Sequence, residues 1–134
     1  MALEISHRER EGIPILDLKG RIVVGNEASA FRDAFDRLTT EAGSRLLLNM
    51  KLVDYVDSTG LGAIVMCATR TKSAGGAAKL VHVNRRQIEL LIVTKLDTIF
   101  EIFEDETEAV NSFFPERRIK RFDILSFIQE MEKE

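Results

Sequence analysis

The fold is decided by the stretch VDYVDSTGLGA, residues 53–63, in which Asp57, two adjacent hydroxyls and two glycines stand between two apolar runs. The run before it, LLL at residues 46–48, is typical of a buried strand, and the run after it, residues 61–68, is typical of a helix. Ser and Asp are favoured at such a junction because their side chains accept hydrogen bonds from the first free N–H groups of a helix. Those N–H groups and the helix dipole also attract anions. The stretch therefore predicts a strand-to-helix turn that could hold a negative group.

Outward from this turn, strand patterns recur along the chain. Two alternating runs flank Glu11-Gly12, which predicts a hairpin. Pro14 lacks an N–H and therefore fits an edge, or the start of the second strand. The expected strands are residues 3–6, 13–18, 45–49, 79–83 and 98–103.

Four stretches between and after these strands carry apolar side chains at helical spacing. The first opens near Gly25-Asn26 and is expected to stop at Gly43, and the second covers residues 59–73. The third follows Asn84 and the fourth follows the acidic residues 104–106. Outside the second helix the apolar positions are Phe31, Ala34, Phe35 and Leu38, then Ile88, Leu91, Ile92 and Leu96, then Ala109, Val110 and Phe113. The alternation predicts an α/β fold, a mixed and mostly parallel sheet of about five strands with about four helices.

The composition predicts one ordinary soluble domain, with 134 residues, 45% of them hydrophobic and 31% charged. A net charge of −3 provides no strongly basic face, so we expect no direct contact with DNA. No apolar run approaches the ~20 residues needed to span a bilayer, and the N-terminus has no signal-peptide pattern. The single cysteine, Cys67, stands in an apolar run and is expected to be buried, which fits a reducing compartment. We therefore expect a cytoplasmic protein.

Catalytic motifs are missing from the sequence. There is no phosphate-binding G-x-x-x-x-G-K-[ST], no G-x-G-x-x-G after a strand and no G-x-S-x-G around Ser58. The two histidines, His7 and His82, fall in separate predicted strands, and Cys67 does not form a metal-ligand spacing with them. We therefore expect no catalytic residue, no metal and no cofactor. An enzyme that uses Ser58 as a nucleophile is the least favoured interpretation.

The residues of the turn have a structural explanation beside the functional one. Asp57, Ser58 and Thr59 could each serve only as a helix cap. Gly60 and Gly62 could simply permit close packing of the helix on the sheet. Local chemistry alone leaves both explanations open.

Residues 115–134 differ in composition from the rest of the chain. Pro115 interrupts the pattern, and RRIKR at residues 117–121 is basic. Residues 122–134 predict an extra C-terminal helix, which either docks on the domain or contacts a partner or a second copy in a dimer. Basic clusters attract phosphates, but one short cluster on an acidic chain is weak evidence for a nucleic-acid or membrane surface. The apolar positions of this helix are Ile124, Phe127, Ile128 and Met131.

Residues 56–62, VDSTGLG, resemble the phosphorylation motif of bacterial anti-sigma factor antagonists, the STAS-domain proteins. That motif is an Asp, a phosphorylatable Ser, a small or hydroxyl residue and then Gly-Leu/Ile-Gly. Four further segments resemble family patterns in the same order. They are residues 18–22 (LKGRI), 80–84 (LVHVN), 94–100 (TKLDTIF) and 108–110 (EAV). The resemblance covers about residues 3–114, so we expect a STAS-like domain over residues 1–114 and a C-terminal extension over residues 115–134.

The resemblance implies a protein-binding switch. Such an antagonist binds an anti-sigma factor that is also a serine kinase, and this binding releases a sigma factor. The kinase phosphorylates the serine, here Ser58, and the complex separates until a metal-dependent serine phosphatase removes the phosphate. The antagonist is a substrate in this cycle and performs no catalysis itself.

The resemblance also indicates where the partner would dock. The family's docking surface surrounds the phosphorylated turn, here Asp57, Ser58, Thr59, Gly60 and Gly62. By position, its expected rim is Gly25, Asn26, Glu27 and Tyr55. The alternative hypothesis keeps the fold without the switch, as a STAS scaffold subunit of a signalling assembly or a lipid-transport complex.

Overall fold

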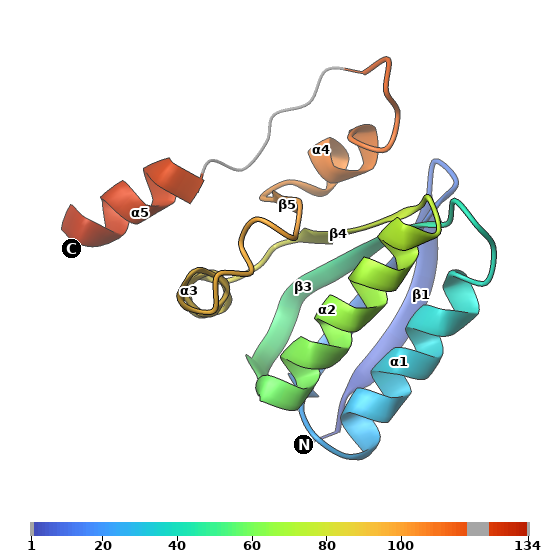
Figure 1. The fold of residues 1–134 in the computed structure, drawn as a ribbon, viewed down its shortest axis with the longest axis horizontal. Helices are drawn as coiled ribbons and strands as arrows, with labels where there is room; N and C mark the ends of the chain where they lie inside the picture. Colours follow the sequence, from blue (N-terminus) through green and yellow to red (C-terminus); the bar gives the residue numbers. More distant parts are fainter. Residues whose placement is uncertain (1, 118–123, 134) are drawn as a thin grey trace.

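The computed structural model describes residues 2–117 and 124–133 and contains one five-stranded sheet (Figure 1). The first two strands form an antiparallel hairpin, and the second to fifth strands run parallel to their neighbours. Their order across the sheet follows the sequence. The strands are β1 (Glu4–Arg10), β2 (Ile13–Ile22), β3 (Arg45–Val56), β4 (Ala77–Val81) and β5 (Ile102–Phe103). The predicted mixed, mostly parallel sheet is confirmed.

Five helices lie in the described part of the chain: α1 (Asn26–Leu38), α2 (Ser58–Ser73), α3 (Arg85–Val93), α4 (Glu106–Asn111) and α5 (Ile124–Lys133). α1 and α2 lie side by side over one face of the sheet (Figure 1). α3 adds Leu91 to the main core, and Cys67 of α2 is fully buried there, as the sequence predicts. The apolar periodicity of the helices therefore identifies the residues that pack on this face.

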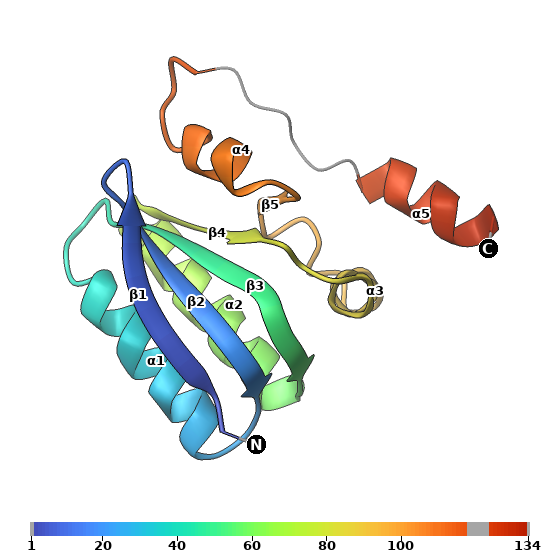
Figure 2. The same cartoon turned by 180° about the vertical axis from the view of Figure 1, so that it is seen from behind.

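α4 covers part of the opposite face of the sheet. Its Ala109 and Val110, with Phe113 beyond its end, pack against Ile15 of β2 and Leu47 of β3. In Figure 2, the face of β1, β2 and β3 turned away from α1 and α2 carries no other described helix. Part of that sheet face is therefore left uncovered by the described helices.

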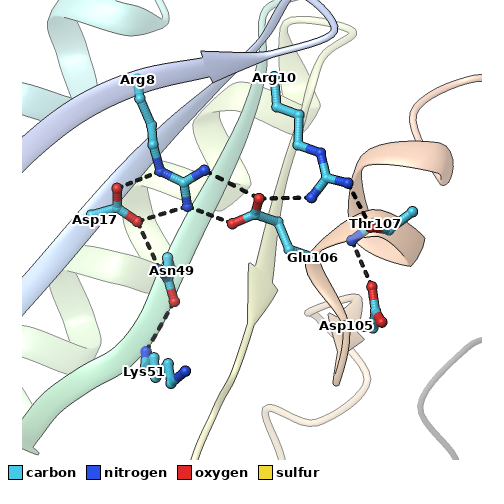
Figure 3. A network of polar contacts seen from close by, with 8 residues as sticks. All are labelled: Arg8, Arg10, Asp17, Asn49, Lys51, Asp105, Glu106 and Thr107. Carbon is cyan, nitrogen blue, oxygen red and sulfur yellow. Dashed lines mark hydrogen bonds and ion pairs between the residues drawn. The ribbon is translucent and has the colours of Figure 1, made fainter.

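A polar network fixes the start of α4 to the sheet (Figure 3). Arg8 of β1 donates to Asp17 Oδ2 at 2.6 Å and also to Glu106 of α4, while Arg10 donates to Glu106 Oε2 at 2.8 Å. Asn49 of β3 donates to Asp17 Oδ1 at 2.7 Å. The Arg8 guanidinium, with a smaller effect from Arg10, lowers the pKa of Glu106 to about 2. The network joins three strands to one helix by charge-assisted hydrogen bonds.

All five strands differ in extent from the prediction, and β1 and β2 each continue four residues past their predicted ends at Ser6 and Leu18. β3 continues to Val56 instead of ending at Asn49, because two shifts of register against β2 break the alternation that the sequence pattern relies on. β4 ends at Val81, since His82 has a φ of 58° and leaves the extended conformation. β5 is only two residues long, and the predicted strand residues before it form a turn in which Ile99 N donates to Leu96 O.

Three helices end earlier than expected, among them α4, which ends at Asn111, so the prediction that Phe113 lies on this helix is wrong. α1 ends at Leu38 with Thr39 as its C-cap, so Gly43 is not its stop signal. α3 ends at Val93, so the prediction that Leu96 lies on this helix is wrong. Leu96 still packs against the main core, from the turn after the helix. Its apolar character therefore marks burial and not helical register.

The predicted C-terminal helix is present as α5, and Figures 1 and 2 show it standing away from the sheet. Residues 122, 123 and 134 of that prediction, and residues 118–121 of the basic cluster, lie outside the described residues. The division into residues 1–114 and 115–134 stays a prediction. Within the described ranges, the helices fall short of the length and apolar character that a membrane crossing needs.

Candidate functional site

Asp57 is the N-cap of α2, and Ser58 is the first residue of the helix. The Asp57 backbone is extended, with φ −89° and ψ −177°, and its Oδ1 accepts from Gly60 N at 2.7 Å. Leu61 N donates to Asp57 O at 2.8 Å and begins the helical hydrogen bonds. The interpretation of Ser58 as the cap is therefore wrong, because the carboxylate one residue earlier holds that position.

The same carboxylate also joins the turn to the loop between β2 and α1. Asp57 Oδ2 accepts from Val24 N at 3.0 Å, and Asp57 N donates to Ile22 O at 3.2 Å. The N–H groups of Gly60 and Val24 lower the pKa of Asp57, because they stabilise its charged form. Asp57 is therefore an anion that two segments of backbone hold in place.

Gly60 is required by a close backbone approach, whereas Gly62 is not. A Cβ on Gly60 would lie 1.9 Å from Ile22 O and 2.7 Å from Ile22 C. A Cβ on Gly62 would meet nothing within 4 Å, and Gly62 is exposed. The packing explanation therefore accounts for Gly60 alone.

The hydroxyls of the turn face solvent. Ser58 and Thr59 are both exposed, and among the described residues no hydrogen bond to Ser58 Oγ is found. The N–H groups of Thr59 and Gly60 at the start of α2 are engaged by Asp57 and not by a separate anion. A further negative group on Ser58 would consequently lie next to an existing carboxylate and would point outward.

The expected rim is brought near the turn through the Asp57 contact with Val24. Gly25, with φ 105°, and Asn26 are exposed at the start of α1, and Glu27 is half-buried there. Tyr55 lies near the end of β3, two residues before Asp57. It is on one face of the sheet, and the buried Val56 is on the other. Whether any of these residues contacts a partner stays a prediction.

Two residues of this region were missed by the sequence analysis. Val24 is an exposed apolar side chain in the loop that Asp57 holds, and Arg21 places its guanidinium 5.2 Å from the centroid of the Tyr55 ring. The run RIVVG at residues 21–25 gave no signal for Val24, because three adjacent apolar residues at the end of a strand predict burial. The side on which Arg21 lies follows only from the register of β2 with β3.

Other chemistry-bearing residues lie away from the turn. Burial raises the pKa of the Cys67 thiol, which favours its neutral, unreactive form. His7 is on the edge strand β1, and His82 follows β4. Within the described part of the chain, no group of three or more His, Cys, Asp or Glu residues could hold a metal ion.

Comparisons with known proteins agree with this fold. The family model of the STAS domain matches residues 4–109. The anti-sigma-B factor antagonist of Bacillus subtilis is 32% identical over 102 residues, which are 76% of this chain and 92% of that protein. The Bacillus subtilis protein is therefore related to this chain over nearly the whole of the Bacillus protein's length.

Two solved structures show the same fold. An anti-sigma factor antagonist from Mycobacterium paratuberculosis has a TM-score of 0.71 at 15% identity, covering 84% of this chain and 94% of that one. The Bacillus cell fate determinant SpoIIAA in its phosphorylated form has a TM-score of 0.62 at 15% identity, covering 83% and 98%. At such identities the likeness concerns the fold alone. The family model and the related sequence carry the assignment further: the chain belongs to the STAS domain family.

Proposed function

We propose that this protein is an anti-sigma factor antagonist that binds an anti-sigma factor with serine kinase activity and is released when Ser58 is phosphorylated. The observation that carries the proposal is the position of Ser58, an exposed hydroxyl at the first residue of α2 beside a charged cap. A kinase can reach such a hydroxyl without unfolding the domain. The name of the Bacillus subtilis relative supports the same role.

The effect of a phosphate at Ser58 would fall on binding. A phosphate adds about −1.5 to −2 charge at pH 7. Asp57 already occupies the N–H groups of Gly60 and Val24, so the phosphate would remain in solvent next to a carboxylate. In a packed interface this charge would be repelled and would be costly to desolvate. Unphosphorylated protein would bind and free a sigma factor, and phosphorylated protein would not.

The remaining steps belong to other proteins. The kinase supplies the phosphoryl group from ATP, and a metal-dependent serine phosphatase returns Ser58 to its free hydroxyl. In this proposal the chain catalyses neither step. Its own part is to present the Ser58 hydroxyl and the rim around it, including Tyr55 and residues 25–27.

The test combines partner capture with phosphate mapping. The purified chain is used to capture its binding partner, ATP is added, and the phosphorylated residue is located by mass spectrometry. We expect phosphate on Ser58, none on the Ser58→Ala variant, and unchanged labelling of Thr59→Ala, which removes the neighbouring exposed hydroxyl. Ser58→Asp should weaken binding at least tenfold, or about 1.4 kcal/mol.

Two results would contradict the switch. The first is a native partner that leaves Ser58 unmodified in the presence of ATP. The second is a Ser58→Asp variant that binds as tightly as wild type. Either result would favour the non-switching scaffold subunit, in which Ser58 is only the first residue of a helix.

A further inference from the structure

The strand β1 lies at the edge of the sheet, and its outer side has no strand beside it. Among the described residues β1 pairs only with β2, and Figure 2 shows it as the outermost strand. Such an edge presents unpaired N–H and C=O groups, which can pair with a strand of another chain. We call this outer side of residues 4–10 the β1 edge. It contains no residue of the Ser58 turn or of the rim around that turn.

The hairpin determines which backbone groups of β1 point outward. Both residues of its turn have positive φ, Glu11 of 53° and Gly12 of 80°, as in a two-residue hairpin that closes on a hydrogen-bonded pair. The next pair, Glu9 with Pro14, is of the other type, because Pro14 has no N–H to donate. The two types alternate along an antiparallel ladder. The residues whose N–H and C=O groups point outward are therefore Ile5, His7 and Glu9.

The arginines of β1 do not protect this edge against pairing. Charged side chains on an edge strand commonly prevent association with another strand. Arg8 and Arg10 are instead directed across the sheet, where Arg8 donates to Asp17 and Arg10 donates to Glu106 (Figure 3). A neighbouring strand would therefore meet arginines whose charges are already compensated.

The sequence of β1 is complementary to itself in one antiparallel register. When two copies are centred on His7, all three outward-facing residues fall in hydrogen-bonded pairs. The facing pairs are Glu4 with Arg10, Ile5 with Glu9, Ser6 with Arg8, and His7 with His7. No acid faces an acid and no arginine faces an arginine, and the two ends of the paired segment bring opposite charges together.

The other symmetric registers that use outward-facing residues are less favourable. A register centred on Glu9 places Glu9 opposite itself and Arg8 opposite Arg10, which are like charges. A register centred on Ile5 pairs only the beginning of the strand, since β1 starts at Glu4. The register centred on His7 is therefore the one that a second copy of this chain fits.

A groove beside the β1 edge is also complementary to itself. Its volume is about 600 Å³, and it lies between β1 and α1, with Ile5 and His7 on one wall and Ala30, Asp33 and Arg37 on the other. Asp33 and Arg37 are exposed and lie about one turn apart on the helix. In two antiparallel α1 helices, the acid of each copy can face the base of the other.

We propose that two copies of the chain pair through their β1 edges, about a two-fold axis at His7, and so join their sheets into one continuous sheet. Each of the three hydrogen-bonded pairs contributes two backbone hydrogen bonds. The α1 helices lie beside each other across the same axis, next to the groove. The contact is isologous, because each copy contributes the same surface. This dimer goes beyond the proposed switch and leaves the Ser58 turn of each copy accessible.

The first measurement is the molar mass of the full-length chain by size-exclusion chromatography with light scattering. We expect a dimer for the wild type, and association weakened at least about tenfold in His7→Pro and in Glu4→Lys. The proline removes an outward N–H and leaves the hydrogen bonds to β2 in place, while the lysine faces Arg10 of the other copy. The matched control is Glu41→Lys, which reverses an exposed acid outside the sheet and should stay dimeric. Far-UV circular dichroism verifies that each variant is folded.

The second measurement tests the register by disulfide trapping. In the proposed dimer the two His7 Cα atoms are about 5.5 Å apart, a distance that a disulfide can bridge. The two Glu9 Cα atoms are about 13 Å apart along the strands, because each faces Ile5 of the other copy. Mild oxidation should therefore link His7→Cys into covalent dimers and leave Glu9→Cys, an exposed position on the same face of β1, largely unlinked. The wild type, in which Cys67 is fully buried, gives the background.

Three results would overturn the proposal. They are a wild type that is monomeric at about 100 µM, a dimer that His7→Pro and Glu4→Lys both leave intact, and a dimer in which His7→Cys is linked no better than Glu9→Cys. All these measurements are made without ATP and without an anti-sigma factor. Failure of the dimer therefore leaves the proposed switch at Ser58 untouched, and failure of the switch leaves the dimer untouched.

Discussion

At the scale of single residues, the two glycines of the GLG sequence differ in their structural roles. Gly60 lies against the carbonyl group of Ile22 at the end of β2, so it has no room for a side chain. Gly62 lies two residues later on the exposed side of α2, where a Cβ meets open space. The sequence motif does not distinguish the two glycines, because a close approach between segments far apart in the chain cannot be predicted from the spacing of residues within the motif.

Alanine at each glycine should therefore have opposite effects on stability. Gly60→Ala should lower the free energy of unfolding by about 1–3 kcal/mol, because the methyl group forces the backbone of Ile22 away from α2. Gly62→Ala should raise it by about 0.5–1 kcal/mol, since alanine is the better residue within a helix. Urea unfolding measured by circular dichroism gives both values. Equal losses for the two variants would show that the close approach at Gly60 does not matter.

The cap assignment shows what local sequence reasoning could and could not achieve. Asp57, Ser58 and Thr59 are all acceptable caps, so composition predicts the position of the helix start to within one or two residues. The structure assigns the cap to Asp57 because this side chain also accepts the Val24 N–H from the β2–α1 loop. A long-range contact, absent from any local pattern, therefore decides between them.

At the scale of elements, α4 is attached to the sheet by charge as well as by apolar packing. Glu106 has a side chain only 18% exposed and pairs with both Arg8 and Arg10 (Figure 3). Glu106→Gln should lower the free energy of unfolding by about 1–2 kcal/mol at pH 7, because charge-assisted hydrogen bonds are lost. Glu104→Gln, an exposed change in the same acidic run, should have little effect.

The Glu106 contribution should depend on pH in one direction. Its pKa in the folded protein is about 2, below its ordinary value of 4.5, so the stabilisation is complete above about pH 4.5 and is lost as the pH falls toward 2. The difference in unfolding free energy between wild type and Glu106→Gln should therefore shrink between pH 5 and pH 2. A difference that stays constant over this range would contradict the ionic role of Glu106.

The lengths of the elements mark the limit of the sequence patterns. The order of strands and helices was predictable because apolar periodicity reports burial directly. The continuation of β3 to Val56 was not, since its two register shifts against β2 interrupt the alternation. β5 was predicted too long because the apolar residues before it are buried or half-exposed in a turn. Burial and backbone hydrogen bonding are separate properties, and only burial produces a strong pattern in the amino-acid sequence.

At the scale of the whole molecule, the candidate docking residues lie at one end of the sheet and the α4 network lies toward the other end. The sequence placed the turn correctly because all of its residues are contiguous. It could not place Leu52 and Lys19 on one open sheet face, since this depends on strand register and on how far α4 extends. The uncovered part of the sheet therefore emerged only from the three-dimensional arrangement.

A charge at Ser58 should leave the fold as a whole unchanged. We expect Ser58→Asp to alter the free energy of unfolding by no more than about 0.5 kcal/mol, because the residue is exposed and makes no side-chain contact that packing depends on. Chemical denaturation and amide NMR spectra would test this, with shift changes expected only near the turn. Widespread shifts or a large loss of stability would show that the modification acts by unfolding.

Ile22 O accepts from Asp57 N and lies against Gly60, so the turn and the end of β2 are packed together as one block. A phosphate placed on Ser58 in such a block requires no rearrangement of the turn before it can affect a partner. The response time of the proposed switch would then equal the time of phosphoryl transfer plus partner dissociation, with no delay for conformational relaxation. Because Ser58 is exposed on this packed block, we expect the phosphate to be added and removed repeatedly without the domain passing through a partly unfolded, protease-sensitive state.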